Sequence, residues 1–160
     1  LYDVTDDARA RASSYRLRSD SGFAYQPWQI ARAQTRSGQK SFLFNFTQAP
    51  PLPPQLQFHQ PRMPFGYGAY HGAEIWYAFG NFDQQPWAWT DVDRQVAEHF
   101  GSYIVNFARS GDPNGAGLVE WSPFDPSKDQ ALRIGARTEM SAVENREALH
   151  FHARRFGAAD

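Results

Sequence analysis

The clearest periodic pattern in the chain spans residues 90–109, where apolar side chains recur every three or four positions. Thr90 precedes this pattern as an N-cap, and Gly111 follows it as a helix-ending residue. The pattern predicts a long amphipathic helix with one buried face. The expected buried stripe consists of Val92, Val96, Phe100, Tyr103, Ile104 and Phe107.

Two charged helices are expected near the ends of the chain. Residues 5–15 alternate charged and small side chains after Thr5, the expected N-cap, and predict a solvated surface helix. Residues 142–155 end in basic side chains, which suit the negative end of a helix dipole. His150 and His152 lie two positions apart in this second helix, so we expect them on different faces and not as joint metal ligands.

Residues 23–36 and 41–46 predict a helix followed by a strand. The helix ends at a Ser-Gly pair, and phenylalanines at alternate positions of 41–46 point to one face of the strand. The apolar side of the helix is expected to hold Trp28, Ile30 and Ala31. Residues 131–134 predict a second, edge-like strand. A helix that leads through a glycine turn into an apolar strand is typical of an α/β sheet.

Prolines and glycines dominate residues 49–70 and predict one long ordered loop. Its proline-rich beginning, residues 49–54, is typical of a stiff surface loop; such a stretch also serves as a ligand for domains with aromatic grooves.

Composition narrows the possible functions. The chain has 160 residues and a formal net charge of −1, which gives no electrostatic case for nucleic acid or an anionic membrane as partner. It has no cysteine, so a disulfide framework, a thiolate metal site and a cysteine nucleophile are excluded. It has no apolar run long enough for a membrane-spanning helix. The chain opens without Met, and we expect it to be part of a longer polypeptide.

Among five histidines, His71 has the most informative neighbours. It follows Tyr70 and precedes Gly72 in a glycine-rich loop, directly before an aromatic segment. Small neighbours allow close approach to the imidazole, as the general base of a hydrolase requires. His59 and His99 have no such setting.

Two motifs then suggest a family. Residues 68–75 read Gly-Ala-Tyr-His-Gly-Ala-Glu-Ile and are followed by Tyr-Ala-Phe-Gly-Asn at 77–81; residues 106–114 read Asn-Phe-Ala-Arg-Ser-Gly-Asp-Pro-Asn, with Trp-Ser-Pro-Phe at 121–124. Together with a weaker match at Ser19-Asp20, they resemble the type B carboxylesterases, the carboxylesterase/lipase or cholinesterase-like family, from about residue 19 to 156.

The resemblance implies an α/β-hydrolase fold and a Ser, Glu or Asp, His triad, of which only His71 matches here. No Gly-x-Ser-x-Gly and no Gly-Gly-Gly run occurs among the 160 residues. Residues 1–160 are therefore expected to be the C-terminal segment of a single α/β-hydrolase catalytic domain, incomplete and inactive alone, whose upstream part carries the serine and the acid. Asp20 is the one substitute acid we consider within the chain, and Glu74 is expected to accept backbone N–H bonds in its own loop.

The expected function is hydrolysis of a small carboxylic ester through an acyl-enzyme, without a cofactor or metal. The alternative is a cholinesterase-like binding or adhesion protein that has lost its nucleophile. Substrate-binding residues are not assigned; aromatic residues near His71 are expected to wall a pocket or to serve ordinary packing: Tyr67, Tyr70, Trp76, Tyr77, Trp87 and Trp89. The resemblance is compatible with a secreted or periplasmic protein, but the sequence does not fix the compartment.

Overall fold

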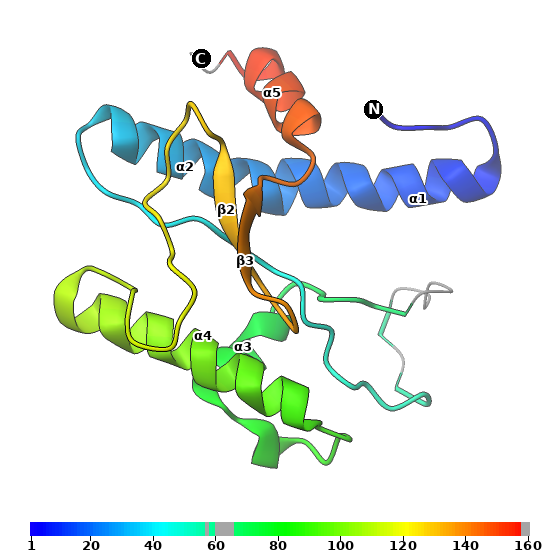
Figure 1. Ribbon diagram of the computed structural model, residues 1–160. Helices are drawn as coiled ribbons and strands as arrows, with labels where there is room; N and C mark the ends of the chain where they lie inside the picture. Colours follow the sequence, from blue (N-terminus) through cyan, green and yellow to red (C-terminus); the bar gives the residue numbers. More distant parts are fainter. Residues whose placement is uncertain (57, 60–65, 158–160) are drawn as a thin grey trace. The chain divides into compact units, whose positions relative to one another are not determined.

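The computed structural model describes residues 1–56, 58–59 and 66–157 (Figure 1). The chain divides into two compact units. The first unit comprises Leu1–Leu43, Pro123–Ala131 and Ser141–Asp160, and the second comprises Phe44–Ser122 and Leu132–Met140. Each unit is therefore built from segments that lie far apart in the sequence.

The first unit begins with a nearly unbroken run of helix. α1 (Asp7–Arg18) passes directly into a π-helical segment (Ser19–Ala24) and then into α2 (Tyr25–Arg36) (Figure 1). Both helices expected here are present, although α1 begins two residues later and ends three residues later than the predicted 5–15. Gly38 follows α2 with a left-handed φ of 76°, which fits the predicted end at the Ser-Gly pair.

The expected N-cap of α1 is wrong. Asp6 caps the helix, because its backbone is extended and its carboxylate accepts a 2.9 Å hydrogen bond from the Arg9 N–H. Thr5 lies one residue before this cap, and its hydroxyl donates to Asp3 at 2.8 Å.

The core of the first unit forms where α2 packs against α5 (Arg146–Arg155). Trp28 and Ala31 of α2 are buried as expected, but the Ile30 side chain is 61% exposed. Residues 28 and 31 share a helix face, whereas residue 30 lies about 200° around the helix from residue 28. The buried cluster consists of Trp28, Ala31, Phe124, Leu149 and Ala153.

The three strands form one sheet, in the order β1-β2-β3. β1 (Phe44–Phe46) pairs in parallel with β2 (Gln130–Ile134), with Phe44 opposite Leu132. β3 (Glu139–Ala142) follows β2 after residues 135–138, a connection that permits only antiparallel pairing. The chain thus combines helices with a small sheet that contains a parallel pair, as an incomplete α/β fold would.

The structure corrects three expectations, two about the strands and one about the last helix. β2 is the central strand, not an edge strand, and its Leu132 and Ile134 side chains are fully buried. β3 occupies residue 142, where the sequence predicted the start of the last helix, so α5 begins only at Arg146. β1 itself is shorter than the predicted 41–46 segment.

Helices α3 (Ala73–Phe79) and α4 (Asp91–Ser110) pack against each other in the second unit (Figure 1). Thr90 caps α4 as expected, and Gly111 ends it with a φ of 75°. Half of the predicted stripe is buried, namely Val96, Phe100 and Tyr103, while Val92, Ile104 and Phe107 are exposed.

The alternating phenylalanines of β1 lie on one face, as the sequence predicts, and the structure shows that this face packs against α4. The Phe44 and Phe46 rings lie 5.3 and 5.6 Å from the Phe100 ring. Edge and tilted contacts of this kind give aromatic pairs stability beyond their buried area. The described residues of the predicted loop 49–70 contain no helix, and residues 57 and 60–65 of that loop lie outside the described residues.

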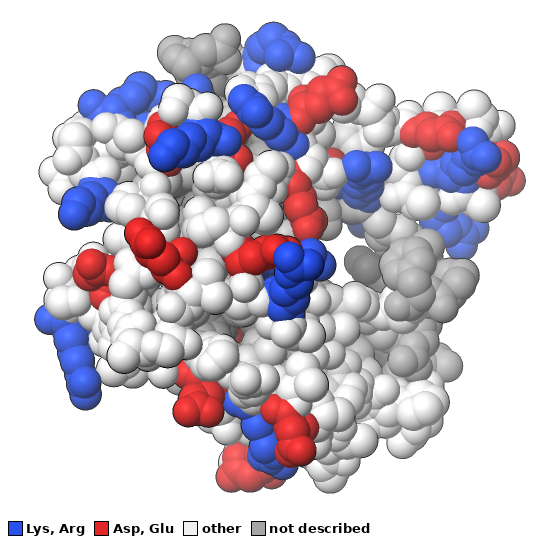
Figure 2. Space-filling view, in the orientation of Figure 1, with Lys and Arg blue, Asp and Glu red and all other residues white. Residues whose placement is uncertain are grey.

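Charged side chains of both signs lie on the face of the molecule that Figure 2 shows. On the face shown in Figure 2, acidic and basic residues are interspersed, and neither sign forms a broad patch. Among the described residues, no helix is both long and apolar enough to cross a bilayer.

Candidate active site

His71 lies at the surface in a turn directly before α3. Gly72 follows it with a φ of 90°, a left-handed conformation that glycine adopts without strain. The Ala73 N–H donates to the Tyr70 carbonyl at 2.9 Å and closes the turn around the histidine. The exposed imidazole is therefore carried on a backbone whose shape is fixed on both sides.

Glu74 stabilises this turn through its side chain. Its carboxylate Oε2 accepts a 3.1 Å hydrogen bond from the Gly72 N–H. This confirms the expectation that Glu74 binds backbone in its own loop. The carboxylate also lies in the first turn of α3, where negative charge is favourable because of the helix dipole.

The aromatic residues near His71 form a connected cluster. The Trp87 ring lies 5.3 Å from both the Trp76 and the Trp89 rings, and Trp76 Nε1 donates to the Tyr70 hydroxyl at 3.3 Å. Tyr77 is fully buried and packs in the core, and it also borders the groove between α3 and α4, which His71 does not line.

Asp93, at the start of α4, is the centre of a buried network that sequence analysis did not single out. Its Oδ1 accepts from the Tyr77 hydroxyl at 2.7 Å and from Gln48 Nε2 at 2.8 Å. Its Oδ2 accepts from the N–H and the hydroxyl of Thr90 at 2.9 and 2.7 Å. The spacing of Thr90 and Asp93 is that of a capping box, which is the signal that could have identified the local half of this network.

Burial and hydrogen bonding together set the ionisation of Asp93 and Tyr77. Burial alone would raise the pKa of Asp93, but the bonds from Thr90, Tyr77 and Gln48 outweigh it and hold that pKa below its ordinary value. Burial, reinforced by the neighbouring Asp93 carboxylate, raises the pKa of Tyr77. At neutral pH the network therefore consists of an ionised carboxylate and a protonated phenol.

The Asp93 network should make stability depend on pH on the acid side. Because the pKa of Asp93 is lowered on folding, its contribution is present above the ordinary carboxyl pKa and is lost as pH falls through the folded-state value. We expect Thr90→Ala to destabilise the intact protein near pH 6 and to do so progressively less as the pH falls below 3.8, the ordinary carboxyl pKa. Denaturant unfolding at several pH values measures this difference.

Ser110→Ala is the matched control for that experiment. The Ser110 hydroxyl donates to the Asn106 carbonyl at the opposite end of α4, far along the helix from Asp93. Its effect should not vary with pH. A pH-independent Thr90→Ala effect would contradict the role given to Asp93.

Asp20 is held by partners within the first unit. Its side chain is 1% exposed, and it accepts from the Tyr2 hydroxyl at 3.0 Å and from Asn145 Nδ2 at 2.7 Å, one bond to each oxygen. Burial, together with the bond to Asp20, raises the pKa of Tyr2 to about 12. These contacts describe a structural carboxylate and do not favour Asp20 as the substitute catalytic acid.

Asp129 is, after Asp93, the second buried carboxylate that the sequence analysis did not single out. Trp28 Nε1 donates to its Oδ1 at 2.6 Å, while Arg146 Nε and His150 Nε2 lie 3.0 and 3.3 Å from its Oδ2. His152 instead contacts the Tyr2 hydroxyl at 3.1 Å. The two histidines of α5 thus have different partners on different faces, as their spacing predicted.

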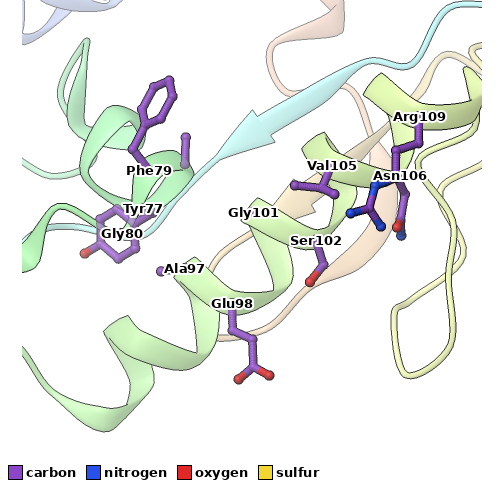
Figure 3. A pocket seen from close by; sticks show the side chains of 11 residues that line it. Tyr77, Phe79, Gly80, Ala97, Glu98, Gly101, Ser102, Val105, Asn106 and Arg109 are labelled. Carbon is purple, nitrogen blue, oxygen red and sulfur yellow. The ribbon is translucent and has the colours of Figure 1, made fainter.

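An open groove of about 530 Å³ lies between α3 and α4 (Figure 3). Small residues such as Ala97 and Gly101 form its floor on α4, and Glu98 and Arg109 lie along the same helix. His71 does not line this groove, so its volume is not evidence of a substrate site beside the histidine. The described residues also contain no cluster of three or more potential metal ligands.

Comparison with known proteins assigns the chain to a family. The sequence model of the carboxylesterase family matches residues 2–152, which is nearly the whole chain. The chain belongs to the carboxylesterase family.

Curated relatives of this chain include a carboxylesterase, a lipase and a cholinesterase. Carboxylesterase 1D of Rattus norvegicus is 29% identical over 138 residues, which are 86% of this chain and 23% of the relative. Bile salt-activated lipase of Bos taurus is 32% identical over 124 residues, 74% of this chain and 19% of the relative. Acetylcholinesterase 1 of Caenorhabditis briggsae is 32% identical over 100 residues, 62% of this chain and 15% of the relative. The chain thus spans about a quarter or less of the length of these relatives.

The second motif of this carboxylesterase-family chain, residues 106–114, has a structural role in the described turn. Asn106 Nδ2 donates to the carbonyls of Pro113 and Asn114 at 3.2 Å each. The Asn114 amide in turn bonds the backbone of Trp121, accepting from its N–H at 2.7 Å. These side-chain bonds satisfy backbone groups beyond the end of α4, where no helical partner exists.

Proposed function

We propose that the intact protein hydrolyses carboxylic esters and that this chain supplies the catalytic histidine, His71. The observation that carries the proposal is the exposed His71 imidazole on a turn fixed by Gly72 and Glu74, in a chain of the carboxylesterase family. The same family membership supports residues 1–160 as the C-terminal segment of one α/β-hydrolase domain, whose serine and acid lie upstream.

In this mechanism His71 acts twice as a proton carrier. It takes the proton of the upstream serine as the serine oxygen attacks the ester carbonyl carbon, and it then gives that proton to the departing alkoxide. An acyl-enzyme remains. His71 next takes a proton from water, which attacks the acyl carbon, and returns that proton to the serine as the carboxylic acid leaves.

The remaining parts of the triad would act on His71 from outside this chain. A carboxylate bonded to its second ring nitrogen would fix the tautomer and stabilise the imidazolium that forms during attack. Backbone N–H groups would hold the oxyanion. Since protonated imidazole cannot accept the serine proton, activity should be lost at acid pH.

An organophosphorus probe tests the proposal against its alternative. The probe should react covalently with the intact protein at one serine outside residues 1–160 and leave this segment unlabelled, because no Gly-x-Ser-x-Gly occurs in it. Mass spectrometry of proteolytic peptides locates the adduct. Prior acid unfolding, which destroys the site, is the control.

Two outcomes would contradict this expectation. An adduct within residues 1–160 would mean that the nucleophile lies in this chain. Complete absence of labelling in folded protein would favour the alternative, a cholinesterase-like binding or adhesion protein that retains His71 without a nucleophile.

A further inference from the structure

Helix α3, which directly follows His71, depends on tertiary contacts for its position. It has 7 residues, and its N-cap Gly72 makes no side-chain capping bond. Isolated helices of this length are not stable in water, because the cost of nucleation exceeds the gain from so few hydrogen bonds. The residues that anchor α3 therefore also decide where the turn carrying His71 lies.

The anchor is the bond between Tyr77 and Asp93. Both side chains are buried, at 0% and 2% exposure, and their oxygen atoms lie 2.7 Å apart. Figure 3 shows Tyr77 projecting from the α3 side of the groove, beside α4. A short hydrogen bond to an ionised carboxylate is stronger than one between neutral groups, so it fixes the distance between the two helices.

The same carboxylate connects α3 to the sheet. Gln48, just beyond the end of β1, donates to Asp93 at 2.8 Å. The Gln48 Oε1 atom accepts from the Ala136 N–H at 3.1 Å, in the connection between β2 and β3. Asp93, at the start of α4, is thus bonded directly to α3 through Tyr77 and to one end of the sheet through Gln48.

Rigid contacts also connect Tyr77 to His71. Ala73 is fully buried and its N–H closes the turn on Tyr70, while Trp76 bonds the Tyr70 hydroxyl from the next turn of α3. A displacement of α3 at Tyr77 is therefore transmitted to the residue before His71.

We propose that Tyr77 and Asp93 are positioning residues for His71: their buried bond sets the place of α3 and, through it, of the catalytic imidazole. This inference rests on the proposed function of His71. Neither residue touches substrate. Catalysis is sensitive to such placement, since a misplacement of about 1 Å costs roughly 10²-fold in rate.

The test compares Tyr77→Phe with Tyr103→Phe in the intact protein. Both changes remove one hydroxyl and keep the ring, and Tyr103 is a matched control because it is 1% exposed and donates to the Val119 carbonyl at 2.6 Å, away from α3. We measure kcat per organophosphorus-titrated active site, KM for an aryl ester, and thermal unfolding. Tyr77→Phe should lower kcat about tenfold or more with KM nearly unchanged, and Tyr103→Phe should lower Tm without lowering kcat.

Two further variants, at Asp93 and His71, distinguish failure of the positioning role from failure of the proposed function. If Tyr77→Phe does not fold, Asp93→Asn should show the same loss of kcat. Asparagine keeps the side-chain shape but removes the charge and one of the two oxygens that accept from Tyr77, Gln48 and Thr90, so it weakens the bond to Tyr77. The positioning role would be overturned if the Tyr77 or Asp93 variant had the same kcat as Tyr103→Phe. If His71→Ala were inactive in the same experiment, the proposed function of His71 would still stand. An active His71→Ala variant would overturn the proposed function itself.

Discussion

Replacing His71 with alanine in the intact protein should lower kcat/KM for a simple aryl ester by about 10³-fold or more. Removal of any member of a serine-hydrolase triad leaves only the contributions of the oxyanion hole and of substrate binding. The side chain is exposed on a turn that backbone bonds close, so its removal should leave the fold intact. Steady-state hydrolysis rates per folded molecule measure the effect.

The other histidines are internal controls for this experiment. These controls are His59, His99, His150 and His152. Substitution of any one of them by alanine should change turnover far less, because none lies in a glycine-flanked turn like that of His71. Two of them, in α5, contact Asp129 and Tyr2 and should affect stability more than rate. Retention of even a tenth of the activity in His71→Ala would refute the catalytic assignment.

Asp129→Ala should lower the free energy of unfolding by about 3 kcal/mol. The substitution leaves the buried Trp28 N–H without its acceptor and removes the carboxylate that Arg146 and His150 contact. It also places alanine at a φ of 53°, where residues other than glycine, asparagine and aspartate are strained. Chemical denaturation of the intact protein measures the loss.

Two further variants, Asp129→Asn and Asp125→Ala, show how much of the lost free energy of unfolding comes from the missing contacts and how much from backbone strain. Asparagine tolerates the left-handed backbone and keeps an acceptor for Trp28, so it should cost less than alanine. Asp125 is a nearby carboxylate whose Oδ1 accepts from the Ser127 hydroxyl at 2.7 Å in an exposed turn, and its loss should have only a small effect. An Asp129→Ala variant as stable as Asp125→Ala would show that the buried cluster contributes nothing.

Local patterns determined much of the fold. Thr90 and Gly111 delimit α4 in the structure as they do in the sequence, because capping uses residues adjacent to the helix end. The alternation of Phe44 and Phe46 likewise placed both rings on one face. The bond from Gly72 to Glu74 joins residues two apart, so the shape of the turn around His71 was also predictable.

What the sequence did not reveal depends on partners that lie far away along the chain. β2 is central because β1 reaches it from about 90 residues upstream, and no pattern within residues 131–134 records that neighbour. Gln48 meets Asp93, and Trp28 meets Asp129, across separations of 45 and 101 residues. A carboxylate looks the same in the sequence whether it is solvated or buried, and only tertiary packing removes water and brings several donors to it. The sequence by itself therefore determined the family, both ends of α4 and the His71 turn. Tertiary structure alone decided which carboxylates are buried and stabilise the interior of each unit.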